Sequence, residues 1–539
     1  MERQNNDFFR NRKGEPVFLT GLQCHNSSSG TDMIGQTIEA VRLHGGNLLE
    51  APIYWCEVEK EKDCYDMSMA ADLVDQAKEA GLYLIPLWFG ASKNGLFTYA
   101  PDYIKQNCQI YKRARDSAGL PVESLSPHCR ETLERDKKAF ARVMEFLAEY
   151  DKEGTVIAVQ VENEVGLVHT DRDYSTAAEA EYRRPVPEYL RNVRIPDSGI
   201  CEKECKKAEA LSWKQLFGRY AQEAFCAWKH ACYIQEMVEA GQEKFDIPYI
   251  MNVSIEINEF REPGLCYISG GPVSRVLDIW KLTAPGIRLF GPDIYLPAER
   301  DYREACEAYA RKDNPLFIPE SLNGGIGAAC NMMIAAADYG AIGICCFGAE
   351  SGIFDGKLLP EAEHTAVSMR AIASLAPLLI KYRGTGRVHA VTQAEFSSWQ
   401  YVKTREYHVT ARFISNDPKP QHYFGSRMNL NVPENAYSMT QRGRCLLVDC
   451  GNGEFYAAGT GVCLSFVRRP EVSDETPYAH LASKLAGQLN FLSIEEGHFE
   501  GNEWVCEYKR NGDEANYQLY IHPGQVVRVR LNPEMMWEE

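Results

Sequence analysis

The sequence lacks long hydrophobic runs and has no excess of positive charge. No stretch reaches the roughly 18 uninterrupted apolar residues that a membrane-spanning helix needs. Lysine and arginine total 58 residues against 75 aspartate and glutamate residues, so the net charge is −17. Nucleic acids and anionic membranes require basic patches on the proteins that bind them, so we expect neither as a partner. The charge balance leaves the substrate open.

Signals for export and for a cysteine-bound metal are also missing. The first residues, MERQNNDFFRNRKGEP, contain no apolar segment of the kind found in secretion signals, and we therefore expect a cytoplasmic protein. The 18 cysteines are scattered along the chain. We interpret them as buried or free thiols of a reducing compartment, with a zinc site held by some of them as the alternative. The oligomeric state stays open, and a homo-oligomer is compatible with the sequence.

The first 380 or so residues alternate between strand and helix patterns. The segments with the character of strands are 17–24, 47–55, 82–90, 155–161, 247–254, 287–296, 315–321 and 341–351. Eight such units in one run predict a (β/α)8 barrel, or TIM barrel, in preference to an open doubly wound sheet. The links after the third and fourth strands are long, at about 91–130 and 165–205. Such links lie on the barrel face that carries active sites.

From about residue 386 the pattern changes to short β-rich segments separated by Asn, Gly, Asp and Pro. This pattern predicts an antiparallel β domain, of the sandwich type. The stretch KYRGTGR (381–387) is a plausible joint. We therefore divide the chain into a catalytic barrel at 1–383 and a C-terminal β-rich domain at 384–539.

Acidic, amide and aromatic side chains recur where the barrel strands are expected to end. In chain order they are Glu50, Tyr54, Trp55, Trp88, Lys93, Asn94, Glu162, Asn163, Glu164, Asp293, Tyr295, Glu320, Phe347 and Glu350. Several carboxylates that converge on one barrel mouth repel each other, which predicts a chemical use for them. Two facing carboxylates suit hydrolysis of a glycosidic bond, in which one protonates the leaving oxygen and the other attacks the sugar or activates water. Aromatic faces and amides suit sugar recognition.

A two-metal site is the alternative use of an acidic barrel mouth. The histidines near expected strand ends are His25 and His169, and neither sits in a pair of metal ligands. We therefore predict no metal and no cofactor.

Several motifs resemble those of known glycosidases. VIAVQVENEVG (156–166) resembles the fourth-strand motif of clan A glycoside hydrolases, and PLFIPES (315–321) resembles their seventh-strand motif. EAPIYWCEVEKEKDCYD (50–66) resembles the second-strand region of family 35 and family 42 β-galactosidases. LWFGASKNG (87–95) and GNGEFYAAGTG (451–461) resemble a bacterial branch of family 35 that carries a C-terminal β domain. The resemblance covers most of the chain.

The resemblance implies a role for each matching residue. Glu164 matches the acid/base and Glu320 the nucleophile of a retaining mechanism. Asn163 matches the amide that binds the sugar 2-hydroxyl, and Tyr295 matches a tyrosine that hydrogen-bonds the nucleophile. The eighth strand, CCFGAES, lacks the tryptophan that many clan members have at the floor of the site.

Stacking on the sugar would therefore fall to Trp88 or Phe347. Glu162 has the same strand parity as Glu164, so we expect it to point inward as a supporting carboxylate. The expected substrate contacts are Asn163, Tyr295, Glu50, Trp88, Asn94, Glu162 and Phe347.

These inferences predict a retaining exo-β-galactosidase whose substrate is an oligosaccharide or glycoside. A β-glucosidase, a β-mannosidase and an α-L-arabinosidase remain alternatives, because few hydrogen bonds read one epimeric hydroxyl. A non-catalytic carbohydrate-binding barrel is the alternative from a different class.

Overall fold

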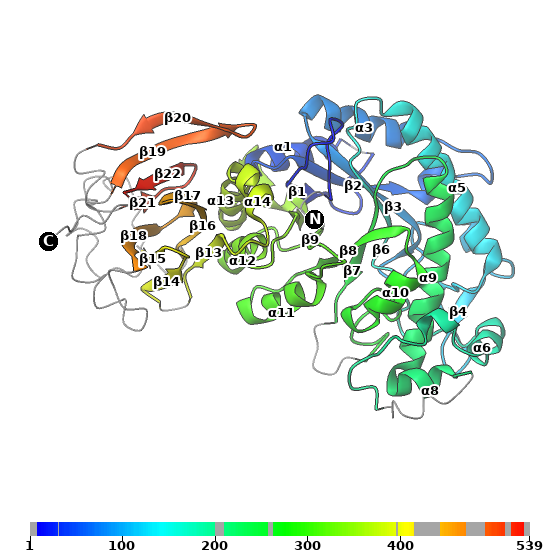
Figure 1. The fold of residues 1–539 in the computed structure, drawn as a ribbon. Coiled ribbons are helices and arrows are strands. Elements are labelled where there is room, and N and C mark those ends of the chain that lie inside the picture. Colours follow the sequence, from blue (N-terminus) through cyan, green and yellow to red (C-terminus); the bar gives the residue numbers. More distant parts are fainter. Residues whose placement is uncertain are drawn as a thin grey trace.

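A computed structural model of the chain (Figure 1) describes residues 8–30, 32–199, 210–256, 262–394, 397–413, 442–469, 491–511 and 519–532. Eight parallel strands form one sheet in the order β8-β7-β6-β3-β2-β1-β10-β9. They are β1 (Leu19–Gln23), β2 (Leu48–Tyr54), β3 (Tyr83–Lys93), β6 (Val159–Asn163), β7 (Tyr249–Ser254), β8 (Ile287–Asp293), β9 (Phe317–Ile318) and β10 (Gly343–Phe347). A parallel bridge between Ile294 and Ser321 joins the two outer strands. The predicted barrel is confirmed, and every strand overlaps a predicted segment.

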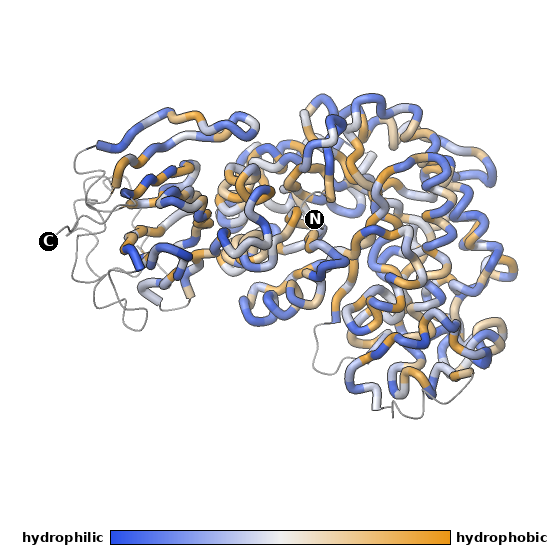
Figure 2. Tube along the Cα trace, in the orientation of Figure 1, coloured by the Kyte–Doolittle hydropathy of each residue, from blue (hydrophilic) through white to orange (hydrophobic). Residues whose placement is uncertain are grey.

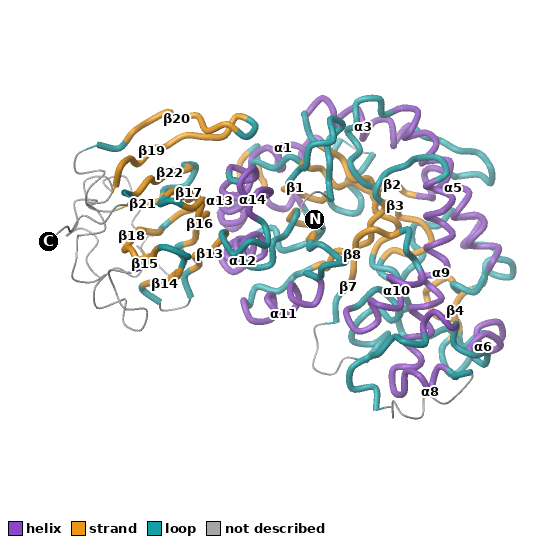
Figure 3. Tube along the Cα trace, viewed as in Figure 1, coloured by secondary structure: helices purple, strands orange, loops and turns teal. Residues whose placement is uncertain are grey.

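Helices follow the strands and surround the sheet (Figures 1 and 3). The longer ones are α1 (Ile34–His44), α3 (Ser68–Ala80), α5 (Arg130–Tyr150), α9 (Ala221–Gln242), α11 (Glu299–Tyr309), α12 (Ile326–Ala337) and α13 (Pro360–Ser374). Shorter ones are α2 (Trp55–Val58), α4 (Asp102–Lys105), α6 (Thr176–Tyr182), α8 (Trp213–Phe217), α10 (Leu277–Thr283) and α14 (Ala376–Tyr382). Two helices, α8 and α9, precede β7.

Two layers of side chains pack against the barrel strands. Leu87 and Phe89 of β3 belong to the cluster that fills the barrel interior. Trp88 lies between them in sequence but belongs to the layer between strands and helices, where its ring packs 5.8 Å from that of Phe140 on α5. In Figure 2 the central strands are mainly hydrophobic in colour, whereas the outer helices alternate between hydrophobic and hydrophilic. This is the burial expected of a barrel covered by amphipathic helices.

The long links expected after the third and fourth strands are present. Between β3 and α5 lie α4 and an antiparallel hairpin of β4 (Arg113–Arg115) and β5 (Pro121–Leu125). Between β6 and α9 lie α6 and α8. Both links leave the carboxyl ends of strands, so they extend the face on which Asn163 and Lys93 end their strands.

The C-terminal region contains two antiparallel sheets. One has the order β13-β16-β17-β22-β19-β20 and the other β14-β15-β18-β21. Their strands are β13 (Val388–Thr392), β14 (Trp399–Lys403), β15 (Tyr407–Phe413), β16 (Arg444–Gly451), β17 (Glu454–Thr460), β18 (Val462–Arg468), β19 (Phe491–Glu500), β20 (Glu503–Lys509), β21 (Leu519–Ile521) and β22 (Val526–Leu531). Leu447, Phe455 and Phe466 are buried in one cluster that draws on both sheets. The predicted antiparallel β domain is confirmed.

A buried arginine ties this region to the barrel helices. The Arg444 guanidinium on β16 donates to Ser368 Oγ over 2.7 Å and to the His364 carbonyl over 2.8 Å, both on α13. Helix α14 ends at Tyr382 and β13 begins at Val388, on either side of the predicted boundary at 383/384. That division stays a prediction, because α13 contacts both parts of the chain.

Three expectations from the sequence concern membrane helices, cysteines and cellular location. No helix in the described ranges is long and apolar enough to cross a membrane. No disulfide joins any two cysteines of the described residues. The expectation of a cytoplasmic protein rests on an N-terminal segment whose residues 1–7 lie outside the described ranges, so it stays an expectation.

Candidate active site

The Glu320 carboxylate is held by four side-chain donors at the barrel mouth. Its Oε1 accepts from Gln23 Nε2 over 3.1 Å, from Asn163 Nδ2 over 3.3 Å and from Asn252 Nδ2 over 3.1 Å. Its Oε2 accepts from the Tyr295 hydroxyl over 2.6 Å. The donors come from β1, β6, β7 and the segment after β8, so four parts of the barrel fix one carboxylate. A group that only accepts hydrogen bonds suits such a set of donors.

Glu164 follows β6 and lies in a different electrostatic environment. Its backbone N–H donates to Asn252 Oδ1 over 2.9 Å. Burial, followed by the nearby negative charge of Glu320, raises the pKa of Glu164 to about 7. A carboxyl group with this pKa still carries a proton close to neutral pH, which suits a general acid.

Asn252 hydrogen-bonds both Glu320 and Glu164, and it was not among the predicted site residues. Its Nδ2 donates to Asp293 Oδ2 over 2.8 Å as well as to Glu320, while its Oδ1 accepts the backbone N–H of Glu164. Burial, then the charges of Glu320 and Glu164, raise the pKa of Asp293 well above its usual value. A single amide in the apolar segment IPYIMNVS was the available signal for Asn252. The same signal, one amide in an apolar segment, was available for Gln23 in VFLTGLQC.

Tyr295 and Phe347 lie together at the mouth, as expected. The Tyr295 side chain is 39% exposed, and burial of its hydroxyl, followed by the charge of Glu320, raises its pKa. It therefore stays protonated and donates to the carboxylate. The rings of Tyr295 and Phe347 meet edge to face at 6.4 Å, and Phe347 meets His25 in the same way at 5.3 Å.

The expected stacking of Trp88 on a sugar is wrong. Its side chain is only 1% exposed and lies outside the barrel wall. Its indole Nε1 donates to Asp136 Oδ1 on α5 over 2.8 Å. The alternation of β3, which places Leu87 and Phe89 inside the barrel, directs Trp88 toward the helices.

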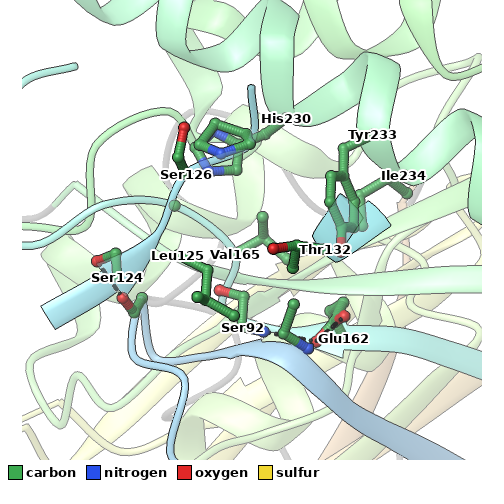
Figure 4. Close-up of a pocket in the computed structure, with 14 residues that line it drawn as sticks. Ser92, Ser124, Leu125, Ser126, Thr132, Glu162, Val165, His230, Tyr233 and Ile234 are labelled. Atoms are coloured by element: carbon green, nitrogen blue, oxygen red, sulfur yellow. Dashed lines mark hydrogen bonds between the residues drawn. The ribbon is translucent and has the colours of Figure 1, made fainter. Parts of the chain in front are cut away.

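The expectation that Glu162 points inward is also wrong. Its carboxylate accepts the backbone N–H groups of Gly90 over 3.1 Å, Ala91 over 3.0 Å and Ser92 over 2.9 Å. Figure 4 shows it beside the segment that carries Ser92. The φ angle of Glu162 is 58°, in the left-handed region, so the strand alternation on which the parity argument depends is broken there.

Glu162 fills an irregularity in the pairing of β3 with β6. Trp88 pairs with Val161 and Lys93 pairs with Asn163, so residues 89–92 lie opposite Glu162 alone. Backbone N–H groups in such a bulge lose their ladder partners, and here the carboxylate replaces those partners. A Cβ on Gly90 would lie 2.6 Å from both Glu162 Oε1 and Asp136 Oδ1, which explains the glycine.

Asp136 completes a buried acid pair with Glu162. Besides the Trp88 indole, it accepts the Tyr233 hydroxyl over 2.8 Å. Burial raises the pKa of both carboxyl groups, and the charge of Asp136 raises that of Glu162 further. The small cavity beside Glu162 and Tyr233 (Figure 4) has a volume of about 30 Å³. It has room for water but not for a sugar, so the contacts of Glu162 are structural.

Glu162→Ala should lower the free energy of unfolding by roughly 3 kcal/mol, because three buried N–H groups lose their acceptor. Denaturant unfolding followed by far-UV circular dichroism measures this loss. The exposed Glu149 on α5 supplies the control, and Glu149→Ala should stay within about 0.5 kcal/mol of the parent. Equal unfolding midpoints for the two variants would contradict the structural role.

Glu50 and Asn94 are placed near the site without a demonstrated role. Glu50 on β2 is fully buried. This burial raises the pKa of Glu50 well above the usual value, and the charge of Glu320 also raises it. Asn94 is exposed, and its Oδ1 accepts from Lys93 Nζ over 2.5 Å. Contact of either residue with a substrate stays a prediction.

Comparison with known proteins gives limited matches. A family model described as "Domain of unknown function (DUF5597)" matches residues 368–522. No curated protein sequence matches the chain. The catalytic domain of β-amylase from Paenibacillus polymyxa is similar in structure, with 14% identity and a TM-score of 0.49 over 67% of this chain and 98% of that one.

Two further solved structures are similar over a comparable share of the chain. The β-galactosidase from Bacillus circulans sp. alkalophilus has 13% identity and a TM-score of 0.49 over 68% of this chain and 57% of that one. The exo-β-1,4-mannosidase Op5Man5 from Opitutaceae bacterium strain TAV5 has 14% identity and a TM-score of 0.43 over 69% and 62%. The chain thus spans 57% and 62% of the length of these two proteins. At such identities and TM-scores they carry no argument about its activity.

Proposed function

We propose that the chain is a retaining exo-glycoside hydrolase in which Glu164 is the acid/base and Glu320 the nucleophile. The observation that carries this proposal is the difference between the two carboxyl environments. Glu320 accepts four side-chain hydrogen bonds, whereas the pKa of Glu164 is raised to about 7. Neighbouring carboxyl groups whose environments differ in this way divide into an acid and a nucleophile.

In the first step Glu320 attacks the anomeric carbon while Glu164 donates its proton to the leaving oxygen. The glycosidic bond breaks, and a covalent glycosyl-enzyme forms. In the second step Glu164, now ionised, takes a proton from water, which attacks the anomeric carbon and releases Glu320. The product keeps the anomeric configuration of the substrate. Proton NMR of the first product formed tests this outcome, and an inverted product would refute the retaining mechanism.

We infer β-galactosides as the substrate class from the motif resemblance, with β-glucosides, β-mannosides and α-L-arabinosides as alternatives. A panel of nitrophenyl glycosides that covers these sugars in both anomeric forms tests the assignment. We expect the highest kcat/KM for the β-galactoside. A higher value for another sugar would change the substrate class and leave the mechanism standing.

A sugar-binding protein without catalysis is the alternative from another class. Such a protein has no use for a carboxyl group that keeps its proton near neutral pH beside a second carboxyl group held by four donors. If no glycoside of the panel is hydrolysed although sugars bind, this alternative replaces the enzyme.

Chelator should leave the activity unchanged, because both proposed steps use only carboxyl groups and water. Among the described residues, no three or more His, Cys, Asp or Glu side chains are arranged to hold a metal ion. The measurement is kcat/KM before and after dialysis against EDTA. Loss of activity that zinc or calcium restores would contradict the proposed chemistry.

A further inference from the structure

Lys93 is a buried cation at the end of β3. The next two residues, Asn94 and Gly95, have φ angles of 54° and 71° and form a tight turn. Lys93 N donates to Leu96 O over 2.7 Å and Leu96 N to Lys93 O over 3.0 Å, which closes this turn. The strand therefore ends at Lys93, opposite Asn163 of β6. Only 7% of Lys93 is exposed, so its charge lies inside the site.

The ammonium group fixes the orientation of the Asn163 amide. Lys93 Nζ donates to Asn163 Oδ1 over 2.8 Å and lies 5.1 Å from the centre of the Phe89 ring. An ammonium group is a donor only, so the oxygen of the amide must face it. The amide nitrogen then faces Glu320 Oε1, 3.3 Å away. If the Asn163 amide were reversed, its NH2 group would face the Lys93 ammonium, and its oxygen would face the Glu320 carboxylate.

Lys93 is also the positive charge in an acidic site. The groups that act on Glu164 are Glu320, Asp293, Tyr295, Ser254 and Lys93. Among them the charge of Lys93 lowers the pKa of Glu164, and it lowers that of Asp293 as well. No carboxylate of the described residues forms an ion pair with Lys93 at hydrogen-bonding distance, so its charge acts on the acids through space.

We propose that Lys93 is a positioning residue of this site, which orients the Asn163 amide toward Glu320 and supplies the cation that compensates Glu164 and Asp293. The proposal rests on the proposed function of Glu164 as acid/base. Such a residue must give up its proton in the first step and accept one in the second. Without the cation, Glu164 would hold its proton too firmly for the second step.

The test compares Lys93→Met, Lys93→Gln and Lys93→Arg in the full chain. Gln keeps a donor for Asn163 but removes the charge, and Arg keeps both. The measurement is the pH profile of kcat/KM on a glycoside with a poor leaving group, for which protonated Glu164 is needed. Removal of a cation raises the pKa of a nearby acid, so the alkaline limb should move upward by about one pH unit in the Met and Gln variants.

The Arg variant should keep the limb of the parent, and so should the control Lys78→Met, which removes an exposed lysine on α3. If Lys93 had only a structural role, its replacement would lower kcat without moving the alkaline limb of the pH profile. If the alkaline limb of the pH profile does not move in folded Met and Gln variants, the compensating role is overturned.

The orientation of Asn163 has its own readout, the preference for a glycoside over its 2-deoxy analogue. It should fall roughly tenfold or more in Lys93→Met but not in Lys93→Gln, and an unchanged preference in Lys93→Met would overturn this part.

Direct titration separates this proposal from the proposed function. Glutamate labelled with ¹³C at the side-chain carboxyl gives a signal for Glu164, which Glu164→Gln identifies. We expect the titration midpoint of that signal to rise in Lys93→Gln, whether or not the protein hydrolyses any glycoside. If the parent is inactive on every glycoside but the midpoint rises, the proposed function fails and the compensating role of Lys93 stands. An unmoved midpoint overturns that role.

Discussion

Replacement of Glu320 by Gly or Ala should abolish turnover of every glycoside, by roughly 10⁵-fold or more. The carboxylate forms the bond to the anomeric carbon, and no leaving group, however good, removes that need. Azide should restore part of the turnover by entering the space left by the side chain. It would attack from the face that Glu320 used, so the glycosyl azide should have the opposite anomeric configuration to the substrate.

Loss of activity alone would not distinguish a missing nucleophile from a collapsed site, since four donors lose their acceptor in these variants. Glu320→Gln keeps the size of the side chain and should be equally inactive while remaining folded by circular dichroism. Glu149→Ala, which removes an exposed acid on α5, should retain full activity. Substantial turnover by Glu320→Gln would exclude Glu320 as the nucleophile.

Replacement of Glu164 by Ala should produce a defect that depends on the leaving group. Glycosides with poor leaving groups should lose roughly 10²- to 10⁴-fold in kcat/KM, because no acid protonates the departing oxygen. Nitrophenyl glycosides should lose much less, because a nitrophenolate leaves without that proton. The alkaline limb of the pH profile, expected near the Glu164 pKa of about 7, should disappear in the variant. Azide should rescue this variant and give a product of the same configuration as the substrate.

Glu162→Ala is the matched comparison, because it removes a chemically identical side chain two positions away. It should lose stability but show neither the dependence on leaving group nor the rescue by azide. If Glu162→Ala shows rescue with retained configuration and Glu164→Ala does not, the two roles must be exchanged.

The barrel could be predicted because its strands and helices carry strong periodic patterns. Strand ends converge in this fold, so the placement of Asn163, Tyr295 and Glu320 at one mouth also follows from the sequence. Asn252 and Gln23 could have been found by asking why an apolar strand contains one amide. The buried contact of Arg444 with α13 depends on packing between regions far apart in the chain, and no local pattern signals it.

Trp88 and Glu162 show where such reasoning fails. Alternation was the only available argument for the direction of Glu162, and it assumes extended backbone at every residue. The left-handed φ of 58° at Glu162 and the pairing shift opposite residues 89–92 break that assumption. For Trp88 the alternation holds, but residue type suggested sugar stacking where the strand direction required a buried position.

The acid pair behind β3 and β6 also limits how the site could be moved to another scaffold. A design that copied only Glu164, Glu320 and their amide partners would lack the pairing shift between β3 and β6. Lys93 would then no longer lie opposite Asn163. The graft would need Glu162 to bind the bulge, Asp136 beside it and a residue as small as Gly90 between them. The smallest portable unit of this site therefore includes residues that no sugar would ever touch.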